Sequence, residues 1–375
     1  MNDNHVYEDP AVTNPITGEQ HIVREAINEY VDSARLDILR AIDEQPVTPS
    51  GIEDRGLVTR QTASEYLSEF MRCALVDLDR DHRYVLTYGG KFALESVENC
   101  LEEITREELA FLSRSPRPFK LLQFLRTGPT EPRELANASP DSPARITIWR
   151  VFQAFEDYGW CESRSGKYHL IRDGEDALYA YQDLIERSEQ AIAKAPFLQR
   201  LSTDLPDFPT HALADADLVF SEAASPGLVV DAALKLCDPR TRRFRIVTSV
   251  FQPTLFKAYH KLVKLGVTLE PIVDASVYER ISQDENLWYL FDNSEHENYT
   301  LTRLEEPLTL GIGLYDDRKV AVGAYNEIGD GNHVAVIISS NDELIEWANK
   351  KYKYYRQQSI DPVDPSLANR ASNTT

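Results

Sequence analysis

Two matching stretches decide the fold: SARLDILRAIDEQPVTPSGIED (residues 33–54) and RPFKLLQFLRTGPTEPRELAN (117–137). Each stretch carries three apolar residues at a spacing that places them on one face of a helix. They are Leu36, Leu39 and Ile42 in the first stretch, and Phe119, Leu122 and Leu125 in the second. A proline-containing break follows in both stretches. The sequence therefore predicts the same helix and the same break twice.

The correspondence continues along the chain. The next segments are RQTASEYLSEF (60–70) and LVDLDRDHRYVLTYGGKFAL (75–94) in one copy, and RITIWRVFQAF (145–155) and WCESRSGKYHLIRDGEDAL (160–178) in the other. Arg60 corresponds to Arg145, and Gly90 to Gly174. An internal repeat follows, in which each copy is predicted as helix, short helix, longer helix, two-stranded hairpin and helix.

This order of elements is that of a winged helix-turn-helix, and each copy resembles that family. In the first copy we expect a buried stripe on the third helix, made of Ala63, Leu67, Phe70 and Ala74. In the second copy we expect the stripe Ile148, Phe152 and Phe155. The resemblance implies that the opposite face of such a helix enters the major groove of double-stranded DNA.

The pattern changes from about residue 204 to short apolar runs between helical stretches. The predicted strands are 217–220, 244–248, 267–273, 308–314, 319–325 and 334–338, and the predicted helices are 226–237, 252–265, 275–291 and 341–357. Strands that alternate with helices predict a parallel core, and the pair around Asp316, Asp317 and Arg318 predicts an antiparallel hairpin.

Three segments of this half carry a second resemblance: DLVFSE (217–222), LTLGIGLYDDRKVAVGAY (308–325) and VAVIISSNDELIEWANKKYKYYRQQS (334–359). They are similar to the sensor domain of archaeal winged-helix regulators of the methanogenesis-regulatory-protein type. The resemblance implies transcriptional control, with a C-terminal domain that senses a ligand or mediates assembly. This sequence departs from the family by a second winged helix at 33–95, which leaves open which copy reads DNA.

We therefore predict a multidomain α+β and α/β protein with two tandem winged-helix domains and a phospholipase-D-like or similar α/β domain. The predicted parts are an N-terminal extension (1–30), winged helix 1 (31–100), winged helix 2 (101–180), a connecting helix (171–203), the sensor or assembly domain (204–358) and a disordered tail (359–375). The apolar positions of the connecting helix suit packing or a dimer seam, and we expect a homodimer.

The charge of the chain argues against simple electrostatic binding of nucleic acid. The net charge is −21, from 61 acidic and 40 basic residues, and the acids are spread along the whole chain. Dispersed carboxylates with few lysines resemble proteins of a salt-loaded, halophilic cytoplasm. The Debye length in molar salt is only about 3 Å, so repulsion between the chain and DNA would be nearly abolished there. DNA binding would then depend on short-range contacts.

The candidate DNA contacts lie on the third helix and the hairpin of each copy. Arg suits guanine or phosphate, and the hydroxyl and amide groups suit phosphate or base edges. The candidate residues are Arg60, Gln61, Thr62, Ser64, Arg72, Arg80, Arg83, Arg145, Thr147, Arg150, Arg164 and Lys167, with His82 and His169 as further wing residues. Ile146 and Trp149 either stack on sugars or bury in an interdomain contact. The polar face of copy one favours it as the base reader.

A candidate effector site lies where the predicted parallel strands end, because ligands of open α/β sheets bind at that edge. The polar residues there are Ser221, Glu222, Thr248, Ser249 and Asp274, with Tyr315 and Arg318 as closing groups. The same residue types also cap helices. The basic cluster Arg240, Arg242, Arg243 and Arg245 either binds an anionic effector or forms a solvated loop.

Other chemistry has little support in the sequence. There is no phosphate loop, dinucleotide fingerprint, zinc-protease helix or nucleophile elbow, and the four cysteines are far apart. We expect no enzyme activity, no cofactor and no metal, and a small-molecule or anionic effector as a further partner. Without a signal sequence or a membrane-length apolar run, we expect a cytoplasmic protein. The alternative function is a winged-helix protein-assembly module that does not bind DNA sequence-specifically.

Overall fold

The computed structural model describes residues 9–31, 33–138, 142–203, 205, 207–221, 225, 227–238, 240–283, 296–325 and 333–360. It divides into two compact units, Met1–Ala195 and Pro196–Thr375, which we call the N-terminal and C-terminal units. The predicted tail lies almost wholly outside the described residues. None of the helices in the described part of the chain is long and apolar enough to cross a membrane.

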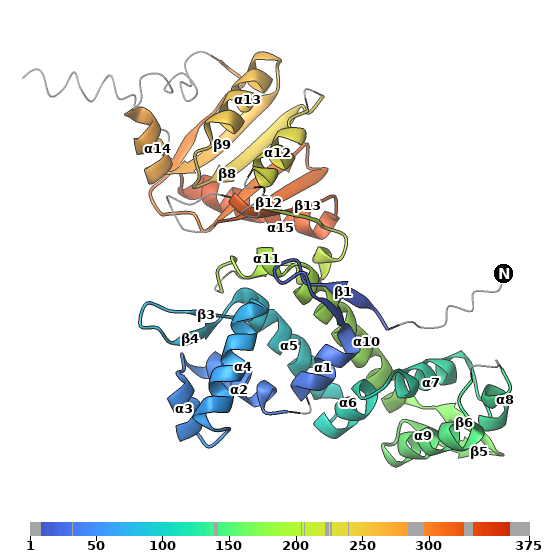
Figure 1. Cartoon of the computed structure of the whole chain (residues 1–375). Helices are drawn as coiled ribbons and strands as arrows, with labels where there is room; N and C mark the ends of the chain where they lie inside the picture. Colours follow the sequence, from blue (N-terminus) through green and yellow to red (C-terminus); the bar gives the residue numbers. More distant parts are fainter. Residues whose placement is uncertain are drawn as a thin grey trace, which may run out of the picture. The chain divides into compact units, whose positions relative to one another are not determined.

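The N-terminal unit begins with β1 (Ala11–Thr13), β2 (Gln20–Ile22) and α1 (Val23–Val31), which occupy the segment expected as an extension. A first module (residues 35–103) follows, with α2 (Arg35–Glu44), α3 (Pro49–Asp54), α4 (Arg60–Arg72), β3 (Val76–Leu78), β4 (Tyr84–Leu86) and α5 (Tyr88–Glu103). After α6 (Arg106–Ser113) comes a second module (116–193), with α7 (Pro116–Thr127), α8 (Pro132–Ala136), α9 (Arg145–Asp157), β5 (Cys161–Arg164), β6 (Lys167–Leu170) and α10 (Arg172–Ala193). Figure 1 shows the modules in blue and in green.

The two modules share the element order that the sequence predicts. Their third helices, α4 and α9, begin at the corresponding arginines and are each 13 residues long. In both modules a single residue that precedes the second helix pairs with the hairpin. Val47 bridges to Tyr84 in the first module, and Thr130 bridges to Tyr168 in the second. Each hairpin is therefore bridged by one residue of the connection between the first and second helices.

A glycine fixes the same close contact in each module. A Cβ on Gly90 would lie 2.0 Å from the backbone oxygen of Leu75, and one on Gly174 would lie 2.2 Å from that of Trp160. Only a residue without a side chain lets the last helix approach the hairpin this closely. The correspondence between Gly90 and Gly174 in the sequence thus has a steric cause.

Apolar side chains divide into two cores within the N-terminal unit. The predicted stripes are confirmed, since Leu67 and Phe70 of α4 and Phe152 and Phe155 of α9 are fully buried. Residues of α1, including Val23, belong to the core around the second module. The helices α5 and α10 pack against each other, and the Arg187 Nε of α10 donates to the Ser96 Oγ of α5 at 2.9 Å.

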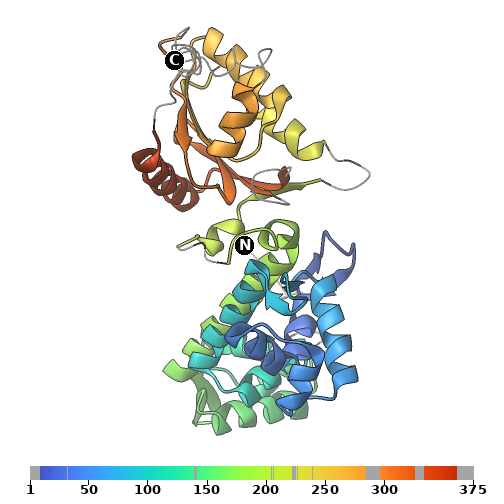
Figure 2. The same cartoon turned by 90° about the vertical axis from the view of Figure 1, so that its left-hand side faces the viewer.

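The C-terminal unit is built on a seven-stranded mixed sheet. After α11 (Ala195–Leu198) and a 3-10 turn (Thr210–Leu213) come β7 (Asp217–Phe220), α12 (Leu228–Lys235), β8 (Arg243–Thr248), α13 (Pro253–Lys264), β9 (Thr268–Asp274), α14 (Ala275–Ser282), β10 (Thr302–Leu304), β11 (Leu310–Tyr315), β12 (Lys319–Tyr325), β13 (His333–Ser339) and α15 (Asp342–Gln358). Figure 2 shows α15, in dark red, on one side of the sheet and the yellow and orange helices on the other.

The strand order is β10-β9-β8-β11-β12-β13-β7, which corrects one prediction. The strands β8, β9 and β10 are parallel neighbours, but β7 pairs antiparallel with β13 at the far edge of the sheet. The expected hairpin of β11 and β12 is confirmed, and β11 also pairs antiparallel with β8. This hairpin and β13 therefore separate β7 from the parallel strands with which it was grouped.

Candidate nucleic-acid interface

The N-terminal end of α4 is fixed by two side chains. The Thr59 Oγ1 accepts from the backbone N–H of Thr62 at 3.3 Å, and the Glu53 Oε1 accepts from that of Arg60 at 3.1 Å. Such a cap is worth roughly 1 kcal/mol to a helix. Because the opposite stripe of α4 is buried, Arg60, Gln61 and Ser64 are exposed on the outer face.

The predicted contacts on α4 differ in how their polar groups are used. The Arg60 guanidinium forms no ion pair with a described residue, whereas Gln61 donates to the Glu65 Oε1 at 3.2 Å. The Thr62 hydroxyl lies 3.0 Å from that of Thr59, inside the cap. Arg72, at the other end of α4, pairs with Glu19 at 2.5 Å. The free cation on α4 is therefore at its N-terminal end.

In the first hairpin one of the two predicted arginines is held by acids. The Arg83 guanidinium pairs with Asp79 at 2.8 Å and with Asp81 at 3.2 Å. Backbone N–H donation from Arg83 is the main cause that lowers the pKa of Asp79. Arg80 is exposed in the turn and forms no ion pair with a described residue, and His82 has a positive φ of 57° that tightens the turn.

The outer face of α9 is more apolar than that of α4. Arg145 and Arg150 are exposed there and form no ion pair within the described part of the chain, while Thr147 is half-buried. Ile146 is 55% exposed and Trp149 is 45% exposed. Neither side chain is buried among the described residues, and both of their expected roles, stacking on sugars and an interdomain contact, stay predictions.

The second hairpin carries no unpaired arginine or lysine. Arg164 pairs with Glu162, and the Lys167 Nζ lies 3.7 Å from Glu134 of α8. The structure thus leaves four of the predicted cations without an ion pair in the described residues. They are Arg60 and Arg80 in the first module, and Arg145 and Arg150 in the second.

The predicted effector residues do not all come together. Thr248, Ser249 and Asp274 follow neighbouring strands, but Ser221 follows β7, four strand positions from β8. At about 4.8 Å per strand this separation is roughly 19 Å, so the expectation that Ser221 converges with the others is wrong. Glu222 lies outside the described residues.

The two closing groups of that prediction are also misplaced. Because β11 runs opposite to β8, Tyr315 pairs with Phe244 at the start of β8, and Arg318 lies in the turn that follows. Arg318 therefore lies at the opposite end of these strands from Thr248. Tyr315 stacks on Phe244 with ring centroids 4.3 Å apart, and burial raises its pKa.

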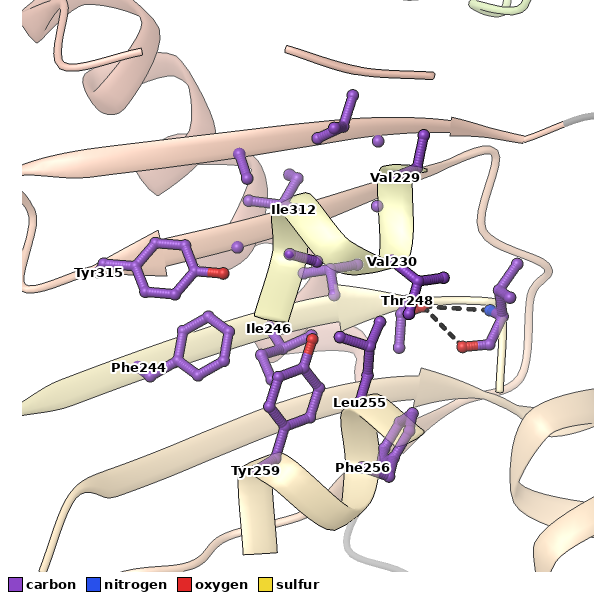
Figure 3. A pocket seen from close by; sticks show the side chains of 18 residues that line it. Val229, Val230, Phe244, Ile246, Thr248, Leu255, Phe256, Tyr259, Ile312 and Tyr315 are labelled. Atoms are coloured by element: carbon purple, nitrogen blue, oxygen red, sulfur yellow. Dashed lines mark hydrogen bonds between the residues drawn. The ribbon is translucent and has the colours of Figure 1, made fainter. Parts of the chain in front are cut away.

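The remaining effector residues are buried and partly act as caps. The Asp274 Oδ1 accepts from the Val277 N–H at 3.0 Å and so caps α14. The Thr248 Oγ1 bonds to the backbone of Val250, as the dashed lines in Figure 3 show. The Ser249 Oγ, the Asp274 Oδ2 and, on β10, the Thr302 Oγ1 are nevertheless buried without a hydrogen-bond partner in the described residues.

An apolar cavity lies beside this edge, against α12 and α13. Phe244, Ile246, Thr248 and Tyr259 are among its lining residues, and Figure 3 shows the hydroxyls of Tyr259 and Tyr315 directed into it. Its volume is about 60 Å³. Small-molecule sites usually have at least ~300 Å³, so this cavity would have to open to admit a ligand.

The arginines of the basic cluster near the start of β8 mostly form ion pairs within the C-terminal unit. Arg240 pairs with Asp238 and Arg243 with Glu270, and Arg245 is buried, where it contacts Asp317 and the ring of Tyr352. The backbone N–H of Arg242 donates to the Asp316 Oδ1. The cluster is therefore neither a solvated loop throughout nor an open site for an anion.

A much larger cavity, of about 630 Å³, was not predicted from the sequence. It lies within the N-terminal unit, and residues of β2, α1, α4, α5 and α10 line it. The segment of β2 and α1 was predicted only as part of an N-terminal extension, and the other lining segments were predicted as ordinary helices. No group of three or more His, Cys, Asp or Glu placed to bind a metal occurs in the described part of the chain.

Two family models match this chain. The model described as HVO_A0261 N-terminal domain matches twice, over residues 24–108 and 106–192. The model described as methanogenesis regulatory protein FilR1, middle domain, matches residues 228–358. The first two matches contain the two modules, and the third lies in the C-terminal unit. No curated protein matches the chain.

Solved structures resemble the chain only distantly. TrmBL2, an archaeal chromatin protein described as showing a novel mode of DNA binding, is 14% identical over 69% of this chain and 100% of its own, with a TM-score of 0.31. Nuc, a phospholipase D family member from Salmonella typhimurium, is 16% identical over 40% and 99%, with a TM-score of 0.32. TM-scores this low do not establish a shared fold. The family models are the informative matches: the C-terminal unit is similar to the middle domain of a regulatory protein, and the N-terminal unit is similar twice over to one N-terminal domain.

Proposed function

We propose that this chain is a DNA-binding transcriptional regulator whose two modules are winged helix-turn-helix domains. One observation carries the proposal: α4 and α9 occupy corresponding places, and each presents an exposed, unpaired arginine at its N-terminal end. A helix that enters the major groove contacts base edges with this end. The match to a methanogenesis regulatory protein supports the same function.

The first module is the better candidate for reading bases. The exposed part of α4 combines Arg60 with Gln61 and Ser64, which can donate and accept hydrogen bonds at base edges. The second module offers Arg145 and Arg150 beside apolar side chains, which suit phosphate contact and packing better. In a homodimer two such modules would meet a pseudo-palindromic operator, as two-fold symmetry requires.

The proposed regulation is by an effector of the C-terminal unit. The unpaired buried oxygens of Ser249 and Asp274 support a ligand site there, because buried polar atoms without partners are unfavourable until something binds them. An effector that prefers one state of this unit would change DNA affinity by its difference in affinity for the two states.

Binding of the full chain to a library of genomic DNA fragments in high-potassium buffer tests the function. We compare wild type with Arg60→Ala, Arg145→Ala and the control Arg318→Ala, which removes an exposed arginine from the C-terminal unit. Selective binding that Arg60→Ala weakens by 10-fold or more, a loss of about 1.4–3 kcal/mol, would name the first module as the base reader. Loss only in Arg145→Ala would transfer that role to the second module.

One observation favours the alternative function, a protein-assembly module. Ile146 and Trp149 expose large apolar surfaces on the outer face of α9, and aromatic residues are enriched where proteins bind each other. If wild type selects no DNA sequence at any salt concentration, the regulator proposal fails and this second function takes its place. The matched variant is then Trp149→Ala, tested for loss of partner capture.

A further inference from the structure

The 630 Å³ cavity of the N-terminal unit has the size of a small-molecule site. It is walled by α1 and by the last turn of α4 on the side of the first module, and by Ser188, Ala191 and Ile192 of α10 on the side of the second. One cavity therefore touches both the proposed reading helix and the helix that closes the second module.

The floor of the cavity is apolar. Its apolar lining comes from α2, α5 and Leu75 of the first module and from α1 and α10 beside it. These residues include Ile27, Tyr30, Leu36, Leu39, Leu75, Leu94, Val97 and Ile192. Tyr30 is held in place by stacking on Phe70, with ring centroids 5.8 Å apart. A ligand with an apolar or aromatic body would bury surface here at about 25 cal/mol per Å².

The charged part of the lining is acidic. Glu25, Glu29 and Glu69 line the cavity, and Arg72 is the one arginine or lysine among its lining residues. A single guanidinium serves two of these acids, because the Arg35 Nη2 lies 2.8 Å from Glu29 and 2.9 Å from Glu69. Arg72 is itself neutralised by Glu19. Glu25 pairs with the Arg24 Nη2 at 2.9 Å, so each of the three acids has a guanidinium partner. The lining residues themselves carry three carboxylates and one guanidinium.

A polar atom without a partner also belongs to this lining. The Nε2 of His21 is buried and makes no hydrogen bond within the described residues, and its nearest acid, Glu19, is 4.0 Å away. A buried polar atom of this kind implies an interaction that the described residues do not supply. Together with Glu29 and Glu69, His21 adds polar groups to a largely apolar lining.

We propose that this cavity binds an organic ammonium ion with an apolar body and that its occupancy changes the affinity of the first module for DNA. The ammonium group lies near Glu29 and Glu69, and the apolar body covers the floor beside Tyr30. Coupling follows from geometry: Glu69 and Arg72 belong to the end of α4 whose other end carries Arg60. The regulatory part of this proposal rests on the proposed function.

The coupling has a defined first step. The ion pair between Arg72 and Glu19 joins α4 to the segment between β1 and β2, and that between Glu69 and Arg35 joins α4 to α2. An ammonium ion near Glu29 and Glu69 competes with Arg35 for these two carboxylates. Binding therefore loosens or shifts the end of α4, and by linkage DNA and the ligand change each other's affinity by the same factor.

Calorimetric titration of the full chain with 2-phenylethylammonium tests the site without DNA. Neutral 2-phenylethanol and anionic 3-phenylpropanoate are the matched probes. We expect the ammonium ion to bind at least 10-fold more tightly than the alcohol, since one charge-assisted hydrogen bond is worth about that factor. Equal binding of all three probes, or no binding of the ammonium ion at either low or molar salt, overturns the proposal.

Three variants locate the site. Glu29→Gln removes a charge at constant shape, Ala191→Trp fills the cavity, and Glu95→Gln is the control on the exposed side of α5. We expect ~10-fold weaker binding in the first variant, no binding in the second and no change in the third. If Ala191→Trp fails to fold, as circular dichroism would show, Glu29→Gln decides alone, and unchanged binding in it overturns the proposal.

A DNA-binding measurement distinguishes the proposed ligand site from the proposed regulatory function. The affinity for the selected DNA fragment is measured with and without saturating 2-phenylethylammonium, in wild type and Glu29→Gln. A change in wild type that is reduced in the variant supports the regulatory site. Ammonium binding without any DNA binding would retain the cavity site and refute the regulator. DNA binding that the ammonium ion does not alter would refute the regulation alone.

Discussion

The two modules of the N-terminal unit have the same frame and different surfaces. In both, a glycine admits the last helix against the hairpin and the third helix begins at an unpaired arginine. The first module faces solvent with polar α4 residues, whereas the second exposes Ile146 and Trp149 and packs its core with aromatic rings. The two modules thus carry the same residue at the sterically constrained glycine position and differ in the residues that face solvent.

The largest expected effect distinguishes the two tryptophans of the second module. Trp160 is 2% exposed and its ring centroid lies 5.6 Å from that of Phe155, so Trp160→Ala should lower the free energy of unfolding by about 3–5 kcal/mol. Trp149→Ala should change it by less than ~0.5 kcal/mol. Urea denaturation followed by circular dichroism measures both. A large loss in Trp149→Ala would mean that this side chain belongs to the fold and not to a contact surface.

The shared frame is tested by adding one methyl group to each module. Gly90→Ala and Gly174→Ala should each cost about 3 kcal/mol, because the new Cβ would overlap a backbone oxygen. Gly159→Ala lies in the second module with no atom within 4 Å of a Cβ and serves as a control for backbone strain, since its φ is +73°. If one of the two variants is tolerated as well as wild type, the modules are not equivalent at this position.

Alkaline pH should destabilise the core around the second module more than the core of the first module. Burial raises the pKa of both Cys100 and Cys161 from 9.0 to about 12, and both belong to the core around the second module. The contribution of these two thiols to the free energy of unfolding is complete below pH 9 and is lost as the pH rises toward 12. The reason is that the thiols of the unfolded chain ionise at a lower pH than those of the folded chain. Each thiol should lower the free energy of unfolding at pH 10 by about 1.4 kcal/mol relative to its value below pH 9.

Urea midpoints at pH 8 and pH 10 measure this loss. The double variant Cys100→Ala/Cys161→Ala should be less sensitive to pH than wild type, while Cys73→Ala, at a half-buried site in the first module, should change the sensitivity less. An unchanged pH dependence in the double variant would show that other groups, such as buried tyrosines, cause the loss.

The smallest effect concerns the hairpin of the first module. Arg80 is unpaired and Arg83 is held by Asp79 and Asp81, so Arg80→Ala should weaken DNA binding about threefold and reduce the salt slope by roughly 0.9. Arg83→Ala should change the slope less, since its charge is already compensated. Titrations between low and high potassium measure both slopes, and equal slopes for the two variants would contradict the assignment.

The frame of the modules could be predicted from sequence because its determinants are local. Helical periodicity, turn residues and the recurrence of Arg60 and Gly90 at Arg145 and Gly174 are all visible along the chain. Even the ion pairs that occupy Arg83 and Arg164 could have been expected, since their acids are only two to four residues away.

The rest depends on contacts between distant segments. An apolar run such as β7 predicts a strand but not its neighbour, and β7 was misplaced because three strands later in the chain separate it from β8. The misplacement of Ser221 and Arg318 follows from that one error of strand order and from the reversal of β11. The N-terminal cavity left no signal, because its walls come from segments that are far apart in the sequence, one of which was predicted only as an extension.

The packing of α10 on α5 sets a limit on how this chain can be divided. The sequence repeat suggests cutting near residue 105, yet α10 covers α5, and Arg187 bonds to Ser96 and lies 5.0 Å from the ring centre of Phe92. A fragment that ends there would lose the helix that shields its last one. The smallest fragment expected to fold on its own is therefore residues 9–195, which means that two modules with separate cores should unfold together as one cooperative unit.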